Sequence, residues 1–186
     1  MEFNSLIQLR QSVRKYADKP IEKEKLIACI EAARMAPSAS NSQPWRFVVV
    51  EEQQLREKVA KETVGPLGTF NKFVKEAPVI LVMVLEKPKL LTEMGGRLKN
   101  KEYPLIDIGI AAEHFCLQAA DLGLGTCMLG WFSEAKLKEL LQIPADRTIG
   151  LLITLGYAPV DYTQRKKIRK PLNEVLRWNG YGNVGM

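Results

Sequence analysis

Residues 104–122 form a segment that would be apolar on almost every side of a helix, and such a helix must be buried on all sides. A membrane span has the same length, but Asp107, Glu113 and Asp121 interrupt the segment. Each charge near the bilayer centre would cost about 2.5–3.5 kcal/mol. The sequence therefore predicts a helix at the centre of the protein or at a contact between subunits, and no membrane association.

Runs of β-branched, aromatic and other apolar residues predict strands in the rest of the chain. The predicted strands are residues 46–51, 78–85, 126–130 and 148–157. Further helices are predicted at residues 5–10 behind an Asn4 cap, at 22–35, at 53–63, and from a Ser133 cap to 141. Helices and strands alternate without a long linker or a repeat, so we expect one domain of the α/β or α+β class over residues 1–186.

Two segments lack a regular pattern. Residues 86–101 contain Pro88, Gly95 and Gly96 among several lysines and arginines, which predicts a mobile surface segment that influences substrate selectivity. The tail from about residue 160 to 186 contains aromatic residues but little periodicity. It is predicted to be an arm that packs on something already folded.

Composition narrows the class of ligand and the compartment. The chain has 27 Lys and Arg against 21 Asp and Glu, a net charge of +6, which favours phosphate-bearing ligands but is too diffuse to indicate nucleic acid. Its three cysteines are far apart in sequence, so neither a zinc site nor a disulfide framework is indicated. No export signal is visible at the N-terminus. We therefore expect a cytoplasmic protein that does not bind nucleic acid.

A loop at residues 36–45 joins a predicted helix to a predicted strand with small hydroxyl and amide side chains and no charge. Such a loop is suited to holding a polar ligand. The alternative is an ordinary turn, because Ser and Asn side chains in turns commonly bond to their own backbone.

Arg10, Ser12 and Arg14 place two guanidinium groups and a hydroxyl at alternate positions, a set able to grip one phosphate together. In a helix, however, Arg10 and Arg14 would share one face, and that face would then be an exposed basic surface. The basic run at residues 165–170 has a similar alternative as a solvated tail.

Other catalytic devices find little support. The chain has one histidine, His114, and it lies within the apolar helix, so a Ser-His-Asp or Cys-His device is not expected and no metal-ligand set is visible. Gly123-x-Gly125 leaves a predicted helix instead of entering one, which excludes a dinucleotide fingerprint by context. The remaining possibility is a site whose side chains mainly bind a ligand and do not themselves react, as in enzymes whose cofactor carries the chemistry.

Four blocks of sequence resemble the FMN-dependent nitroreductase family, and they follow the family order over nearly the whole chain. The blocks are Arg10-x-Ser12-x-Arg14, residues 36–47, residues 123–132, and Leu155-Gly156-Tyr157 leading to Lys167-x-Arg169.

The resemblance implies an α+β fold of three layers, α/β/α, in which helices wrap a central mixed, mostly antiparallel sheet. It also implies an intertwined homodimer with two FMN sites at the subunit interface. The apolar helix of residues 104–122 would lie in the dimer core, and the arm of about residues 160–186 would pack on the partner subunit.

The same resemblance assigns roles to individual residues. Arg10, Ser12, Lys167 and Arg169 would surround the FMN phosphate, and Arg14 would reach the pyrimidine side of the flavin. Asn71 is expected to touch the ring, and the main chain of Leu129 and Gly130 would face flavin N5. The ring and ribityl chain would be lined from the other subunit by Pro37, Ser38, Ala39, Ser40 and Asn41.

The implied activity transfers two electrons from NADH or NADPH through noncovalent FMN to a nitroaromatic compound, a quinone or a related small molecule, with ping-pong kinetics and no catalytic side chain. Two departures from the family pattern leave the substrate open: residues 86–101 are short for a helical excursion over the flavin, and Leu129 replaces an acidic residue of some members. The alternatives are an FMN-binding module without turnover, or another flavin reaction such as enoate reduction, dehalogenation or dehydrogenation.

Overall fold

The computed structural model describes residues 1–65, 68, 70–87 and 101–182. Its centre is a four-stranded sheet with the strand order β1-β2-β4-β3, in which every neighbouring pair is antiparallel. The strands are β1 (Trp45–Val50), β2 (Val79–Leu85), β3 (Gly125–Leu129) and β4 (Thr148–Gly156). The mostly antiparallel sheet is therefore confirmed, and its one parallel element among the described residues is a bridge between Ser12 and Thr126.

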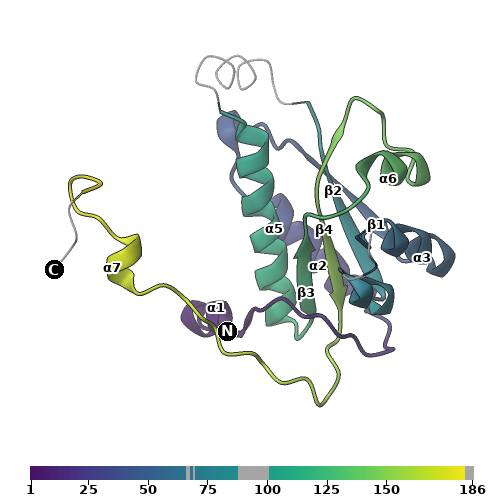
Figure 1. Ribbon diagram of the computed structural model, residues 1–186, viewed down its shortest axis with the longest axis horizontal. Coiled ribbons are helices and arrows are strands. Elements are labelled where there is room, and N and C mark those ends of the chain that lie inside the picture. Colours follow the sequence, from purple (N-terminus) through teal and green to yellow (C-terminus); the bar gives the residue numbers. More distant parts are fainter. Residues whose placement is uncertain (66–67, 69, 88–100, 183–186) are drawn as a thin grey trace.

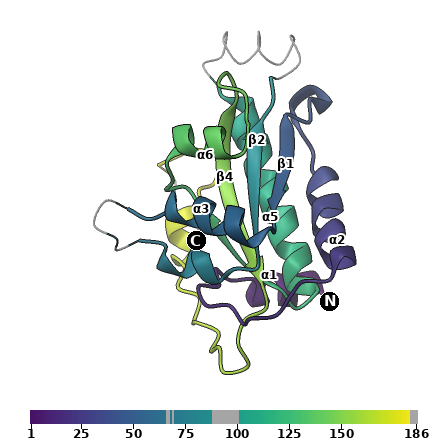
Figure 2. The ribbon, with the colours of Figure 1, turned by 90° about the vertical axis from the view of Figure 1, so that its right-hand side faces the viewer.

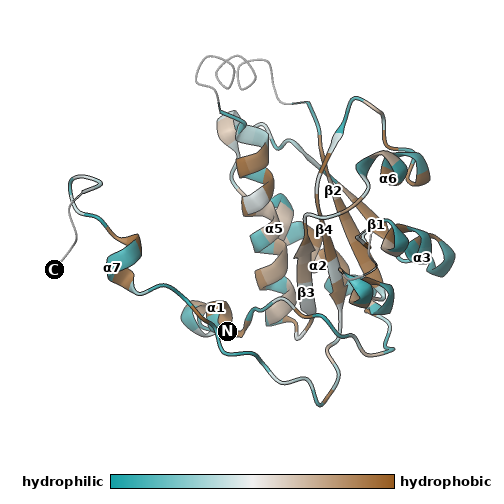
Figure 3. Cartoon of the chain, viewed as in Figure 1, coloured by the Kyte–Doolittle hydropathy of each residue, from teal (hydrophilic) through white to brown (hydrophobic). Residues whose placement is uncertain are grey.

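Helices cover both faces of the sheet and give the fold three layers (Figures 1 and 2). One face carries α2 (Lys23–Arg34) and α5 (Tyr103–Asp121), and the other carries α3 (Gln53–Lys61) and α6 (Glu134–Leu140). Along β2, Leu81 and Met83 pack with α2 and α5, whereas Ile80 and Val82 pack on the opposite side. A strand that is buried on both faces has no polar side, which explains the continuous apolar run in β2 (Figure 3).

The first helix differs from its prediction. Helix α1 (Phe3–Leu9) begins behind Glu2, and no side chain caps it, so the predicted Asn4 cap is wrong. Asn4 lies inside the first turn because the helix starts two residues earlier than predicted. Since α1 ends at Leu9, residues 10–14 are not helical, and the interpretation of Arg10 and Arg14 as one helical face is also wrong. The predicted bounds of the other helices differ from the observed ones by two residues at most.

Helix α5 is buried on one side only within a single chain. Ala111, Ala112 and Phe115 lie in the core against α2 and the sheet. Leu105 and Ile106, near the start of the helix, are 44% and 54% exposed. No helix in the described ranges combines the length and the apolar character needed to cross a membrane.

Four short elements complete the described part of the fold. They are α1, η1 (Ala39–Asn41), η2 (Lys72–Glu76) and α7 (Leu172–Val175). After β4 the chain passes α1 and then forms α7, away from the sheet and the helices that cover it (Figure 1). Helix α7 contains no buried residue. Most of the segment predicted at residues 86–101 lies outside the described residues, because the structure describes only 86, 87 and 101 of it.

Candidate functional site

Residues 10–14 extend the sheet alongside β3. Ser12 bridges Thr126, and the Val13 N–H donates to the Thr126 carbonyl at 2.8 Å. This close approach requires glycine at position 125, because a Cβ atom there would lie 2.7 Å from Val13 Cγ2. The Val13 side chain is buried, whereas Arg10, Ser12 and Arg14 line an open cavity. Gln11 lines the same cavity, so Val13 alone of residues 10–14 turns its side chain into the core.

The cavity has a volume of about 350 Å³ and lies between residues 10–14 and residues 165–169 of the arm. All four residues predicted to surround a phosphate line it, and so does Arg14. Its six cationic side chains are Arg10, Arg14, Arg165, Lys166, Lys167 and Arg169. The fold thus gathers positive charge from the two ends of the chain at one place.

Hydrogen bonds from the arm explain how the two ends meet. Three arm side chains donate to backbone carbonyls at the end of α1 or just beyond it, where a helix leaves carbonyls without intrahelical partners and carries partial negative charge. The bonds run from Gln164 Nε2 to Gln8 O (2.8 Å) and Leu9 O (3.1 Å), from Lys167 Nζ to Ile7 O (2.6 Å) and Arg10 O, and from Arg165 Nη2 to Ser12 O. We call these three residues the arm clasp.

Positive charge in the cavity exceeds the negative charge around it. Arg10 Nε lies 3.2 Å from Glu113 Oε1, and the other five cations form no ion pair with a carboxylate among the described residues. Partial burial, together with repulsion from Arg10 and Arg169, lowers the pKa of Lys167. Such a donor set suits an anion with several oxygens.

The predicted ring contacts gather near the end of β3. Leu129 is buried and Gly130 is exposed. Asn71 Nδ2 donates to Thr63 O at 3.1 Å and to Trp131 O at 3.5 Å, which places Asn71 beside the residue that follows Gly130. These three predicted residues therefore share one region, continuous with the strand that Ser12 bridges.

His114 and Cys127 are held in structural roles. His114 Nδ1 lies 3.2 Å from the Ala32 carbonyl, between α5 and α2. Burial raises the pKa of the Cys127 thiol, which disfavours the thiolate that would attack a substrate. Among the described residues, no group of three or more His, Cys, Asp or Glu side chains is arranged to hold a metal ion.

The Ser/Asn loop lies elsewhere in the chain. Residues 39–41 form η1 after the end of α2, and the Ala39 N–H points at the carboxylate of Asp107 in α5. None of residues 37–41 lines the cationic cavity. One chain therefore brings together the residues predicted to bind the phosphate, and also those predicted to contact the ring. It does not bring the loop of residues 37–41 to the cavity.

Sequence reasoning missed several residues that shape this region. Arg165 lies in a basic run that was recognised, but nothing in the run distinguishes it from Lys166 or Lys170. Gln164 and Asp107 bond to backbone atoms of distant segments. No spacing pattern in the sequence marks such contacts, although an aspartate within an apolar helix is a signal that could have singled out Asp107.

Comparison with known proteins identifies the family. The model of the Nitroreductase family matches residues 7–157. The chain is 30% identical to an oxygen-insensitive NADPH nitroreductase of Helicobacter acinonychis, over 83% of this chain and 85% of the relative. It is similar to the crystal structure of a nitroreductase family protein from Clostridium novyi NT, with a TM-score of 0.78, 33% identity, and coverage of 99% and 97% of the two chains. An FMN-dependent nitroreductase of Clostridium difficile R20291 gives a TM-score of 0.75, 25% identity and coverage of 96% and 100%. The chain therefore belongs to the nitroreductase family of oxidoreductases.

Proposed function

We propose that this chain is an FMN-dependent oxidoreductase that transfers two electrons from NADH or NADPH to a small organic acceptor such as a nitroaromatic compound or a quinone. The observation that carries the proposal is the cavity with six cationic side chains, assembled from the two ends of the chain. The names of two similar proteins, an FMN-dependent nitroreductase and an NADPH nitroreductase, support the same cofactor and donor.

The cavity fits the phosphate end of FMN. Arg10 and Arg169 offer forked guanidinium donors, which match phosphate oxygens well. Lys167 uses two of its three N–H groups on the carbonyls of Ile7 and Arg10, which leaves one for a ligand. A phosphate dianion would also relieve the repulsion that lowers the pKa of Lys167. Ser12 adds a hydroxyl donor, and Arg14 would approach the pyrimidine side of the flavin.

The residues of this chain bind and orient, and when bound, FMN supplies the two-electron transfer. The main chain at Leu129 and Gly130 and the amide of Asn71 would position the ring. No side chain needs to act as a nucleophile, in keeping with the structural roles of His114 and Cys127. Donor and acceptor would use the same open face in turn, so the proposal includes ping-pong kinetics.

The proposal includes a homodimer that completes each site. The loop of residues 37–41 does not line the cavity of its own chain, and in a dimer it would line the flavin of the partner subunit. Leu105 and Ile106 on α5, and Ile168 and Leu172 on the arm, are apolar and exposed. Burying them against a second copy would contribute about 25 cal/mol per Å² of apolar surface, which opposes the entropic cost of association.

The decisive experiment is an absorption spectrum of the purified protein followed by anaerobic titration with NADH and with NADPH. We expect a flavin spectrum and bleaching by at least one of the two donors. A colourless protein that binds no added FMN would contradict the cofactor. Bound flavin that neither donor bleaches would instead identify a binding module without turnover.

A further inference from the structure

We propose that Asp107 is a positioning residue that holds the loop of residues 38–43 at the place on α5 required to bind flavin, and that it acts on the site of the partner subunit. This inference rests on the proposed function. It assigns a role to a buried charged residue of α5 that the cationic cavity and the ring contacts do not use.

The geometry joins Asp107 to the start of the loop. Asp107 is 4% exposed, and its two carboxylate oxygens lie 3.1 Å and 3.2 Å from the Ala39 backbone nitrogen. No Lys or Arg among the described residues forms an ion pair with it. A buried carboxylate without a cation is unfavourable for stability, and alanines occupy the buried face of the same helix at 111 and 112. The carboxylate is therefore better explained by its contact with the loop than by packing.

The loop needs such an anchor because its backbone is strained. Ser40, Asn41 and Gln43 have φ angles of 53°, 49° and 49°, in the left-handed region that costs a residue other than glycine about 1 kcal/mol or more. Inside the loop, the Gln43 N–H donates to Ser38 Oγ at 2.8 Å, and Gln43 Nε2 donates to Asn41 Oδ1 at 2.9 Å. These bonds fix the shape of the loop, while the bond to Asp107 fixes its place on α5.

The position of Asp107 on α5 indicates that its effect crosses the subunit interface. The exposed apolar residues Leu105 and Ile106 directly precede it in the helix, so the helix segment that would meet a partner is also the segment that anchors the loop. The cationic cavity of the same chain contains none of residues 37–41. Asp107 thus links the dimer contact to the ring-binding half of the neighbouring site.

A first test separates positioning from stability. Asp107→Ala removes the acceptor, Asp107→Asn keeps one oxygen acceptor, and Phe115→Leu is a matched control that weakens the core on the same helix. At a temperature where circular dichroism shows every variant to be folded, we expect FMN to bind about tenfold more weakly to Asp107→Ala. Asp107→Asn should restore most of the affinity, and Phe115→Leu should bind like wild type despite a lower melting temperature.

A second test uses mixed dimers that carry a different affinity tag on each subunit. When an Asp107→Ala subunit pairs with an Arg10→Ala subunit, action across the interface predicts one intact site, and therefore about one high-affinity FMN per mixed dimer. Action within one chain predicts two damaged sites and no recovery. Wild-type FMN affinity in Asp107→Ala, or no recovery in the mixed dimer, would overturn this proposal. Failure of the wild-type protein to bind FMN would overturn the proposed function itself.

Discussion

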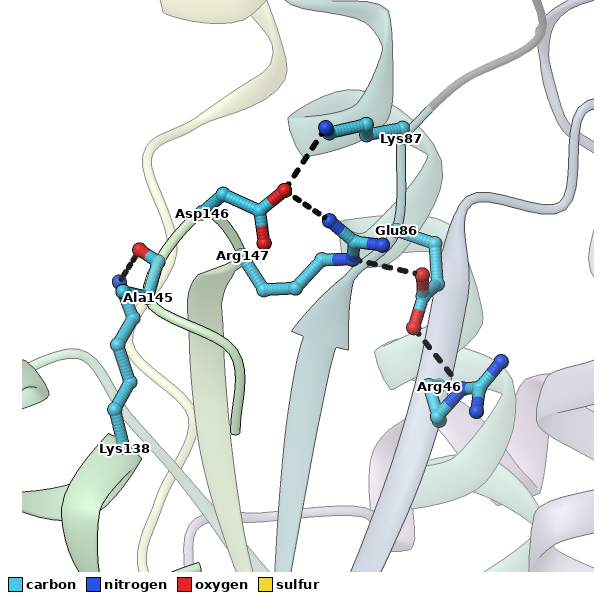
Figure 4. A network of polar contacts seen from close by, with 7 residues as sticks. All are labelled: Arg46, Glu86, Lys87, Lys138, Ala145, Asp146 and Arg147. Atoms are coloured by element: carbon cyan, nitrogen blue, oxygen red, sulfur yellow. Dashed lines mark hydrogen bonds and ion pairs between the residues drawn. The ribbon is translucent and has the colours of Figure 1, made fainter. Parts of the chain in front are cut away.

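Two clusters of charged side chains lie at opposite ends of the sheet and differ in their charge balance. At one end, Arg46, Lys87 and Arg147 meet Glu86 and Asp146 where β2 ends and β4 begins (Figure 4). The ion pairs are Arg46–Glu86 (3.0 Å), Arg147–Glu86 (2.9 Å), Arg147–Asp146 (2.8 Å) and Lys87–Asp146 (2.8 Å). At the other end, the cavity collects six cations, of which Arg10 alone pairs with a carboxylate among the described residues.

The difference indicates two purposes. In the first cluster every cation has an anionic partner within the protein, so the network connects β1, β2 and the loop before β4. Partly exposed pairs of this kind contribute about 0–1 kcal/mol each. In the second cluster, unpaired cations repel one another, and an anion bound among them would stabilise the fold by linkage. The unbalanced cluster is therefore the place to look for a phosphate.

The largest expected effect comes from removing one arginine from each cluster. Arg10→Ala should weaken FMN binding by more than about tenfold, because the phosphate loses a charge-assisted partner worth about 1.5–3 kcal/mol. Arg147→Ala should lower stability but leave the FMN dissociation constant unchanged. Titration monitored by flavin fluorescence measures both. Equal losses of affinity in the two variants would show that the contrast between the clusters has no bearing on binding.

A substitution in the arm clasp should perturb the cavity less, and it can be made without changing a charge. Gln164→Leu removes the donor to the carbonyls of Gln8 and Leu9 without changing the charge of the site. Misplacing Lys167 and Arg169 should weaken FMN binding about fivefold, the equivalent of one net hydrogen bond. Isothermal titration calorimetry measures the affinity. Gln53→Leu, which changes an exposed glutamine on α3, is the matched control. Affinity unchanged by Gln164→Leu would mean that the arm docks without the clasp.

Glu113 is the carboxylate that partly offsets the positive charge of the cavity. Replacing it should increase the difference in charge between the two clusters. In Glu113→Gln, Arg10 loses its carboxylate partner at 3.2 Å and becomes fully available to phosphate. We expect FMN to bind about two- to fivefold more tightly, as suits the loss of one partly exposed ion pair, and the FMN-free protein to melt at a slightly lower temperature. Weaker binding would instead indicate that Glu113 holds Arg10 in the orientation that binds phosphate.

Local patterns predicted the strands well but gave no prediction of their pairing. The apolar run of β2 and the bounds of β4 are properties of neighbouring residues, and each predicted strand agrees with the structure to within one residue at both ends. Which strands are neighbours depends on contacts distant in sequence, such as Gly125 opposite Gly156, and only the family resemblance supplied the class of sheet. The start of α1 was mispredicted because a capping preference is a weak signal where no side chain caps the helix.

The candidate site shows the same division. Resemblance selected Arg10, Ser12, Lys167 and Arg169, and the structure places them around one cavity, while their binding of FMN remains a prediction. The arm clasp could not be inferred from the sequence, because every residue type has a backbone carbonyl. The carbonyls that the clasp contacts also lie more than 150 positions away in the chain. The loop could not be located from the sequence for a similar reason, since its anchor on α5 is a bond to a backbone N–H.

The smallest expected effect is a dependence of stability on pH that the ion-pair network should not share. The pKa of Lys167 lies below its ordinary value of 10.5 because of partial burial and repulsion from Arg10 and Arg169. A lysine with a lowered pKa binds fewer protons when folded than when unfolded, so its contribution to the free energy of unfolding rises as pH rises toward 10.5. In the FMN-free protein, wild type should gain less than about 1 kcal/mol relative to Lys167→Gln across this range.

Urea unfolding at several alkaline pH values measures that gain, with Lys170→Gln as a control lysine outside the cavity lining. Saturating FMN should reverse the trend, because a bound phosphate favours the charged ammonium and loses affinity once Lys167 is deprotonated. A flat difference between wild type and Lys167→Gln without FMN would show that the cations of the cavity do not repel one another appreciably. In that case the excess of charge would no longer distinguish the cavity from the ion-pair network.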